Sequence, residues 1–305
     1  MKVTILMSTY NGEKYLTEQL ESIFAQSQPN ISLLVRDDGS SDKTPEILKK
    51  YADSGKLNWY TGKNLGCAKS FWHLLCNCEQ ADYYAFCDQD DVWDTDKIKI
   101  AVDMLNKEDS DIPLLYCSKV RATDKDLNFK YEFLDRTYPA DYPSSLARNI
   151  APGCSYVFND KLREMLKQYD CNKYGIDIHD WTVFRVAACF GKVVFDEQTH
   201  MCYRQHENNA IGATQSQNKT VIRRLINAAK RYLFKKSDHL ISLSAHRLEE
   251  CYGGQMSEKN KYLTHIVAHY TDNFKNKIIL LTAPEFNFSG FDYWRFKFMV
   301  FINWL

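Results

Sequence analysis

Segments with strand character and segments with helical character alternate along the first hundred residues. Short apolar runs end in polar residues, and each is followed by a stretch whose apolar residues recur at helical spacing. A chain that alternates in this way crosses back over the sheet between strands, which makes neighbouring strands parallel. The sequence therefore predicts an α/β fold with a mostly parallel sheet flanked by helices. The expected strands are 3–8, 31–38, 57–62 and 82–88, and the expected helices are 13–27, 42–52, 67–79 and a segment beginning at Asp94.

Composition limits what such a fold can do. The chain has 305 residues, 45% of them hydrophobic, which is enough to bury a large core. Its formal net charge is zero, so no global field draws it to nucleic acid, and we expect no nucleic-acid partner. The ten cysteines lack metal-ligand spacing and are expected to be reduced. Neither a secretion signal nor an apolar run of roughly 20 residues is evident, which favours a cytoplasmic protein.

Polar loops follow three of the expected strands: STYNGE, RDDGSSD and CDQDDVW. The carboxyl ends of parallel strands meet at one edge of a sheet, where ligands bind in open α/β folds. Tyr10 is suited to stack on a base and Asp38 to accept hydrogen bonds from a base or a ribose, and Gly39 suits a tight turn. The third loop gathers Asp88 and several further carboxylates into one short segment. A solvated acidic turn is the alternative interpretation of that loop taken alone.

Seven motifs together resemble one enzyme family: STYNGEKYL, RDDGSSDKTPEI, NLGCAKSF, CDQDDVW, GCSYVFN, IHDWTVF and YRQHENNAIG. In these motifs, which span about residues 2 to 212, the chain resembles the inverting glycosyltransferases of family 2. Within that family it is most similar to the bacterial rhamnosyltransferase branch. The resemblance implies a GT-A fold and the transfer of a sugar from a nucleotide-sugar to an acceptor hydroxyl, with inversion at the anomeric carbon.

The resemblance assigns the acidic loop to a divalent metal ion, Mn²⁺ or Mg²⁺, that stabilises the departing diphosphate. Asp90 is the expected metal contact, Asp88 approaches the ribose or shares the metal, and Asp91 supports both. The sequence leaves open which carboxylate ligates directly. His206 is a further candidate ligand, with an ordinary hydrogen-bonded histidine as the alternative. If the expected strand continues that far, the side chains of Arg204 and His206 point to the same face of the sheet. The guanidinium of Arg204 is suited to bind the diphosphate.

Asp180 matches the family's catalytic acidic position and is the expected general base, with its pKa raised by an apolar flank. The alternative role for Asp180 is that of a helix N-cap. His179 is expected to position the base. The residues expected to contact the nucleotide are Ser8, Tyr10, Asp38, Asp88 and Arg204. The residues expected around the donor sugar or the acceptor are Gly153, Cys154, His179, Trp181 and Asp91.

Residues 1–212 are therefore expected to form the catalytic domain and residues 213–305 a helical C-terminal region. Basic residues between Lys219 and Lys236 alternate with apolar ones, and the chain ends in the aromatic run FDYWRFKFMVFINWL. This pattern predicts a basic amphipathic helix that can lie on an anionic membrane surface. A solvated helix packed on the catalytic domain is the alternative. We expect peripheral contact with the inner face of the cytoplasmic membrane, which suits a lipid-linked glycan acceptor.

The expected function is sugar transfer in the assembly of bacterial surface polysaccharide or glycan. The resemblance favours dTDP-rhamnose as the donor, with UDP-hexose or UDP-N-acetylhexosamine as the alternative. A non-catalytic protein that binds a nucleotide-sugar is the alternative of another class. The combination of Asp88, Asp90, Asp180 and His206 argues for activity.

Overall fold

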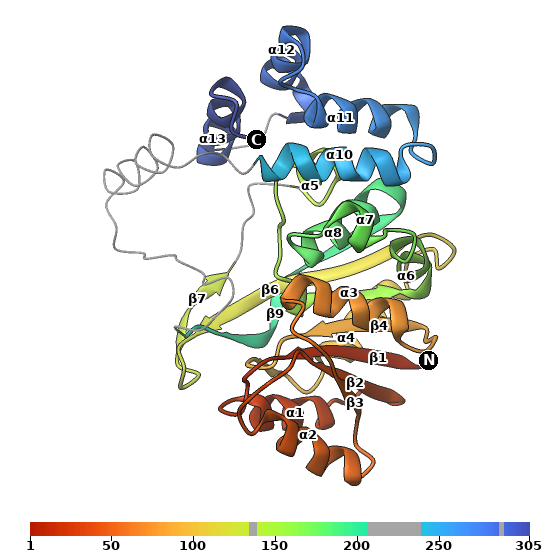
Figure 1. The fold of residues 1–305 in the computed structure, drawn as a ribbon, viewed down its shortest axis with the longest axis vertical. Coiled ribbons are helices and arrows are strands. Elements are labelled where there is room, and N and C mark those ends of the chain that lie inside the picture. The colour runs from red at the N-terminus through yellow and green to blue at the C-terminus, as the bar shows by residue number, and fades with distance from the viewer. Residues whose placement is uncertain (134–138, 207–238, 287–289) are drawn as a thin grey trace. The chain divides into compact units, whose positions relative to one another are not determined.

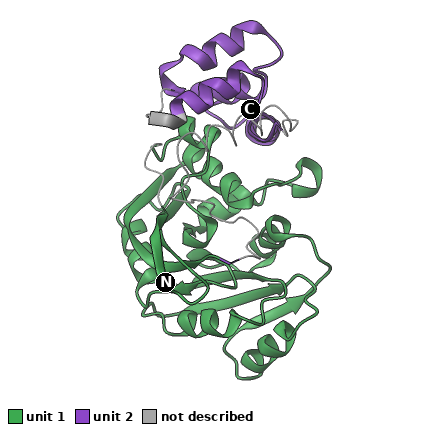
Figure 2. Ribbon diagram, turned by 90° about the vertical axis from the view of Figure 1, so that its left-hand side faces the viewer, with its two compact units in different colours: residues 1–205 green, residues 206–305 purple. Residues whose placement is uncertain are grey.

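The computed structural model describes residues 1–133, 139–206, 239–286 and 290–305. Two compact units divide the chain, unit 1 from Met1 to Gln205 and unit 2 from His206 to Leu305 (Figure 2). The domain boundary predicted after residue 212 lies outside the described residues. The basic residues predicted to contact a membrane, from Lys219 to Lys236, lie outside them as well.

Four parallel strands begin unit 1: β1 (Val3–Thr9), β2 (Ile31–Asp37), β3 (Asn58–Thr61) and β4 (Tyr83–Cys87). They lie in the order β3-β2-β1-β4 and confirm the four strands predicted from the sequence (Figure 1). β1 and β4 are almost wholly buried, as is usual in a sheet that is covered on both faces. Because all four strands run in one direction, the loops that follow them leave from the same edge.

Helices cover both faces of these strands. They are α1 (Leu16–Phe24), α2 (Thr44–Asp53), α3 (Cys67–Asn77) and α4 (Lys97–Leu105). One hydrophobic core joins the buried apolar residues of α1, α2 and α4 to alternate residues of the strands, among them Ile5 and Ala85. α3 covers the other face, where the rings of Phe71 and Phe86 pack edge to face at 5.2 Å.

The sequence DKTPEILKKYA predicts a helix with Thr44 as its N-cap and Pro45 at its first position, and the start of α2 differs from this. Lys43 is the N-cap and Thr44 is the first helical residue, so Pro45 occupies the second position rather than the first. The Thr44 hydroxyl accepts a hydrogen bond from the Gly12 backbone N–H at 2.8 Å, so it holds the loop after β1. The carboxylate of Asp42 accepts from the Thr44 N–H instead. The predicted N-cap role of Thr44 is therefore wrong by one residue.

The remaining strands of unit 1 make the sheet mixed. They are β5 (Val92–Trp93), β6 (Leu114–Thr123), β7 (Phe129–Phe133), β8 (Val157–Asn159) and β9 (Lys192–Arg204). The order continues from β4 as β8-β6-β9-β5, with β7 paired to β6. β8 is antiparallel to both β4 and β6, and only the β6–β9 pair in this half is parallel. A mostly parallel sheet is thus confirmed for the first four strands alone, because the next strand in the sheet, β8, pairs with β4 in the antiparallel direction.

Short helices connect these later strands. They are α5 (Tyr142–Ala147), the 3₁₀ helix η1 (Gly153–Ser155), α6 (Asp160–Leu166), α7 (Cys171–Tyr174) and α8 (His179–Phe190). α8 contacts α3, α5 and α6, and its first turn lies against η1. The long strand β9 ends at Arg204 and stops short of His206, so the strand does not give these two residues the shared side-chain parity that was expected.

Unit 2 is helical, which confirms the expected helical extension. Its elements are α10 (Leu240–Tyr252), α11 (Glu258–Ala268), α12 (Phe274–Thr282), the 3₁₀ helix η2 (Pro284–Phe286) and α13 (Gly290–Phe301). α10 and α11 pack against each other, and Leu248, Leu263 and Val267 are buried there. Within the described residues, no helix has both the length and the apolar character needed to cross a membrane.

Candidate active site

The loop after β2 is held by two buried carboxylates. Asp37 accepts hydrogen bonds from the Thr9 and Thr61 hydroxyls and from the Ser40 backbone N–H. These bonds tie the ends of three neighbouring strands together. The edge of the sheet where a ligand is expected is therefore fixed before anything binds.

Asp38, a predicted nucleotide contact, is 2% exposed and is occupied by donors of the protein itself. Its carboxylate accepts from the backbone N–H groups of Leu65 and Gly66 at 2.9 to 3.0 Å and forms an ion pair with Arg36. A carboxylate offers about four acceptor positions, so these contacts use most of them. In this structure Asp38 shapes the turn that leads into α3, and its contact with a nucleotide stays a prediction.

Tyr10 and Ser8 lie at the end of β1. The Tyr10 side chain is 49% exposed, which leaves its ring accessible to a base. Its backbone N–H and C=O bond the amide of Gln89 at 2.9 and 3.0 Å, which joins the loops after β1 and β4. The Ser8 hydroxyl donates to Ser70 of α3 at 2.6 Å and is half-buried.

The acidic loop after β4 brings like charges together. Burial, followed by the charge of Asp90, raises the pKa of both Asp88 and Asp91. Each of these two carboxylates also raises the pKa of other groups around the loop, since they lie close enough to interact. Like charges held this closely favour either a bound proton or a bound cation.

The residues of this loop fit a divalent cation. Ligand atoms of Asp88, Asp91 and Cys154 all lie within 4.8 Å of one another. The Oδ2 atom of Asp91 is buried and has no hydrogen-bond partner in the described part of the chain. Carboxylate oxygens suit Mn²⁺ or Mg²⁺. Neither Asp90 nor His206 belongs to this group of ligand atoms among the described residues, so their metal roles stay predictions.

Arg204 closes the acidic loop from β9. Its backbone N–H donates to Asp91 Oδ1 at 3.1 Å, and its Nε donates to the Asp90 carbonyl at 2.7 Å. The guanidinium also pairs with Glu18 of α1 and lies 4.5 Å from the ring centre of Tyr15. Since the side chain is buried among these partners, the structure shows Arg204 as a clamp on the loop, and its contact with diphosphate stays a prediction.

Asp180 lies in the first turn of α8. Its Oδ2 accepts a hydrogen bond from the Gly153 N–H at 2.9 Å, and its Oδ1 accepts from the Trp181 N–H at 2.7 Å. Burial raises the pKa of Asp180 to about 6, although these two N–H groups oppose the rise. Its charge also raises the pKa of Asp88, so Asp180 lies close enough to the acidic loop to interact with it. The N-cap of α8 is Ile178, so the alternative N-cap role for Asp180 is wrong.

The position of Gly153 leaves no room for a side chain, because the first turn of α8 lies against it. A Cβ built there would lie 2.8 Å from the Asp180 Cβ and 3.2 Å from His179 Nε2. Real Cβ atoms do not approach other atoms this closely, so a larger residue would displace Asp180. Gly153 therefore lies against the expected base, and its place near the donor sugar or the acceptor stays a prediction.

His179 and Trp181 flank Asp180 and are both buried. The His179 ring stacks on Phe71 at 4.4 Å, and burial lowers the pKa of His179 to about 3. The imidazole is therefore neutral, which suits the positioning role expected of it. The Trp181 indole donates to the Ser145 carbonyl at 2.7 Å and lies under Arg185. Its predicted place in an acceptor pocket stays a prediction.

Three further residues around the loop were not predicted from the sequence. Desolvation and the charges of Asp88 and Asp180 raise the pKa of Cys67, which begins α3. Burial and nearby acidic groups raise the pKa of Tyr203 on β9. The buried Lys97 Nζ lies 3.7 Å from the ring centre of Trp93, and burial lowers the pKa of Lys97 to about 8. Cys67 lies in the motif NLGCAKSF, so the sequence could have indicated it as a candidate. Nothing in the sequence distinguishes Lys97 from an ordinary surface lysine of a helix.

Comparison with known proteins decides the family. The sequence model of Glycosyl transferase family 2 matches residues 4–189. The chain belongs to glycosyltransferase family 2. The glycosyltransferase is 33% identical to the dTDP-rhamnosyl transferase RfbG of Shigella flexneri over 218 residues, which are 68% of this chain and 74% of that protein. It is 28% identical to an uncharacterized glycosyltransferase of Rickettsia typhi, over 67% of this chain and 64% of that one.

Solved structures agree on the fold. The glycosyltransferase aligns with S. aureus TarS in complex with UDP at a TM-score of 0.58 and 17% identity, over 93% of this chain and 76% of that one. It aligns with the mannosyltransferase PcManGT of Pyrobaculum calidifontis, in complex with GDP-Man and Mn²⁺, at a TM-score of 0.53 and 16% identity. That match covers 99% of this chain and 84% of the other. These likenesses confirm the GT-A fold.

Proposed function

We propose that this glycosyltransferase moves a sugar from a nucleotide-sugar donor to an acceptor hydroxyl with inversion, with Asp180 as the general base. The observation that carries the proposal is the position of Asp180 in the first turn of α8, close enough to the acidic loop for its charge to raise the pKa of Asp88. A base with a pKa near 6 is largely ionised at neutral pH and still basic enough to receive a proton. A protein that only binds nucleotide-sugars has no need of such a carboxylate.

In the proposed reaction, Asp180 accepts the proton of the acceptor hydroxyl as the hydroxyl oxygen bonds the anomeric carbon. The bond between that carbon and the diphosphate oxygen breaks, and its electron pair leaves with the phosphate. The N–H groups of Gly153 and Trp181 hold the Asp180 carboxylate in one orientation throughout. Neutral His179, stacked on Phe71, holds the first turn of α8, to which Asp180 also belongs.

Asp88, Asp90 and Asp91 would hold the divalent ion, Mn²⁺ or Mg²⁺, with His206 as a further candidate. A bound divalent cation stabilises the negative charge that develops on the departing diphosphate. Arg204 contributes by fixing the backbone of the acidic loop through its contacts with Asp90 and Asp91. Burial lowers the pKa of Lys97 to about 8, although the negative charge of Asp91 reaches this buried side chain and favours its charged form.

The favoured donor is dTDP-rhamnose, since a relative with 33% identity is named a dTDP-rhamnosyl transferase. The proposed acceptor is a glycan or a lipid-linked glycan in bacterial surface polysaccharide assembly. Tyr10, with its accessible ring, is the residue proposed to stack on the base. Donor hydrolysis with a panel of dTDP- and UDP-sugars would identify the nucleotide and the sugar.

A location at the inner face of the cytoplasmic membrane is also proposed. Trp294, Phe298 and Phe301 recur at helical spacing on α13 and are 71%, 48% and 67% exposed. Residues at this spacing share one face of a helix. Aromatic side chains on one face of a surface helix suit the boundary between headgroups and acyl chains.

Calorimetric titration of the full chain with nucleoside diphosphate tests the metal requirement. We expect binding to weaken strongly when a chelator removes the divalent ion and to recover when Mn²⁺ is added back. The crowding of Asp88 with Asp90 and Asp91 is the reason, because an anionic ligand meets net negative charge without the cation. Equal affinity with and without chelator would remove the metal from this mechanism.

A further inference from the structure

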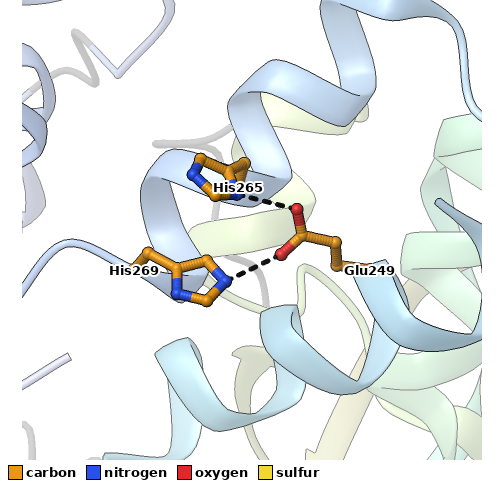
Figure 3. Close-up of side chains that lie close together, drawn as sticks. All are labelled: Glu249, His265 and His269. Carbon is orange, nitrogen blue, oxygen red and sulfur yellow. Dashed lines mark hydrogen bonds and ion pairs between the residues drawn. The ribbon is translucent and has the colours of Figure 1, made fainter. Parts of the chain in front are cut away.

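A second cluster of ionisable side chains lies in unit 2 and takes no part in the proposed reaction. Its members are Glu249 of α10 together with His265 and His269, which lie one helical turn apart at the end of α11 (Figure 3). Their ligand atoms all lie within 4.8 Å of one another. We propose that these three residues form a zinc site that joins α10 to α11.

The two histidines are placed as a metal-binding pair. Residues four apart on a helix lie on the same face, and two histidines at this spacing are a common zinc-binding arrangement. The helical bond from the His269 N–H to the His265 carbonyl, at 2.9 Å, keeps both on that face although His269 is the C-cap. Both rings point toward Glu249, as Figure 3 shows.

The distances are close to those that coordination needs. His265 Nδ1 lies 2.8 Å from Glu249 Oε1, and His269 Nε2 lies 3.0 Å from Glu249 Oε2. In a tetrahedral site with bonds of about 2.0 to 2.1 Å, ligand atoms are separated by roughly 3.3 to 3.4 Å. A zinc ion would therefore require each pair to separate by only a few tenths of an ångström, which small rotations of the three side chains supply.

A second carboxylate supports the site from outside. Asp272 Oδ2 lies 2.7 Å from His269 Nδ1, so the bond to Asp272 leaves His269 Nε2 directed at Glu249. Metal-binding histidines usually donate their other N–H to a carboxylate in this way, which fixes the tautomer and raises the basicity of the ligand. This arrangement is independent of the grouping of the three ligands and favours the same conclusion.

The donor set favours zinc over the ion expected in unit 1. Two imidazole nitrogens and one carboxylate oxygen suit Zn²⁺, whereas Mg²⁺ prefers oxygen ligands alone. Three protein ligands leave a fourth position for water. His246 is a neighbour, since its ring lies 5.3 Å from that of His269, but it is not among the grouped ligand atoms.

Protons compete with the metal at this site. Burial lowers the pKa of His269, but Asp272 and Glu249 raise it, and the net pKa is raised. Metal binding must displace such protons, so zinc affinity falls as the pH is lowered. The measurement is therefore best made slightly above neutral pH.

The test is zinc binding to the full chain, purified with chelator and then kept in excess Mg²⁺ to occupy oxygen-only sites. We expect His265→Ala, which alters a half-exposed side chain, and the double variant His265→Ala/His269→Ala to lose one bound zinc relative to the wild type. Asp272→Asn should keep the site but weaken it by about 10- to 100-fold. The matched control is His73→Ala, an exposed histidine of unit 1 that bonds Tyr60, and it should bind zinc as the wild type does.

Cobalt as a spectroscopic probe separates this site from the acidic loop, whose group includes the Cys154 sulfur. Cobalt bound at the proposed site should give visible bands of tetrahedral type, without a sulfur-to-cobalt charge-transfer band, and these should vanish in the His265→Ala variant. Equal zinc content in the wild type and both histidine variants would overturn the proposal. A cobalt spectrum with a sulfur band that survives the double variant would overturn it as well.

Discussion

The acidic loop of unit 1 and the histidine cluster of unit 2 both concentrate ionisable groups, but they do so with opposite charge patterns. Around the loop, Asp88, Asp90 and Asp91 crowd together as like charges, and burial adds to the cost of ionising them. In unit 2, Glu249 lies between two imidazoles that pair with it. The first arrangement needs an external cation or proton, whereas the second is satisfied by its own members.

The difference has a consequence for function. Paired groups such as Glu249 with its histidines support a local structure whether or not a ligand is present. Crowded carboxylates destabilise the free protein and are stabilised when a cation or a substrate proton arrives, which is characteristic of functional sites. Loss of one carboxylate in unit 1 should therefore change turnover or donor binding. Loss of one member of the histidine cluster in unit 2 should change the amount of bound zinc.

The largest expected effect comes from the proposed base. Asp180→Asn should lower kcat by roughly 100- to 10,000-fold and leave donor binding intact, because the proton acceptor is lost while the shape is retained. Asp90→Ala should lose metal-dependent donor binding together with turnover. Steady-state rates and calorimetry distinguish the two. The matched control is Asp53→Asn, whose surface ion pair with Lys49 lies on α2, and it should behave as the wild type. Near-normal transfer by Asp180→Asn would assign the proton to another residue.

The next effect is the pH dependence of transfer. Since the pKa of Asp180 is raised to about 6, its basic form is present above that pH and is lost as the pH falls through it. The transfer rate should then fall about tenfold for each further pH unit. Acidic groups of the metal site also titrate and contribute to the pH dependence of the rate. Saturating Mn²⁺ should move their titration out of this pH range, so that the remaining pH dependence is that of Asp180. A rate that stays constant down to pH 5 at saturating Mn²⁺ would contradict the role of Asp180.

Gly153→Ala is expected to have a smaller effect, on stability and rate together. The added Cβ would lie 2.8 Å from the Asp180 Cβ, so the first turn of α8 must move. Overpacking of this kind costs about 1 to 3 kcal/mol. Thermal unfolding and kcat measure the two consequences. Gly254→Ala in unit 2 is the control, because a Cβ there meets nothing within 4 Å. Unchanged unfolding and rate in Gly153→Ala would show that the contact is not restrictive.

The smallest expected effect concerns α13. Trp294→Ser/Phe298→Ser should reduce sedimentation with anionic liposomes several-fold, since both side chains are exposed on one helix face. Catalytic rates with a soluble acceptor should stay unchanged. Lys→Gln changes among the basic residues between Lys219 and Lys236 should make the remaining binding less sensitive to salt. Equal sedimentation of wild type and variant would remove α13 from the membrane proposal.

Much of the fold was predictable because it depends on local patterns. The four parallel strands and the helices between them follow from the alternation of apolar runs and helical stripes. The mixed half of the sheet was not predictable, because β8 inserts between β4 and β6 after a long excursion of the chain. Nothing in its short apolar sequence says which strands it will pair with or in which direction.

For the site, sequence motifs identified the acidic loop and Asp180 as candidates, while their contacts came from the structure alone. The carboxylate of Asp38 looked available to a ligand, but backbone N–H groups of a distant turn occupy it. Arg204 looked exposed to a phosphate, but Glu18 and the acidic loop surround it. In both cases the partners come from segments that are far away in sequence.

The sequence by itself determined the α/β class, the edge of the sheet where the polar loops gather and the family to which the chain belongs. Periodicity and turn residues act over a few neighbours, so they can be read without a structure. Tertiary structure decided that Gly153 lies against Asp180, that the charge of Asp180 reaches Asp88, and that Glu249 contacts two histidines. These contacts join elements whose meeting depends on the packing of the whole unit, and no local pattern encodes it.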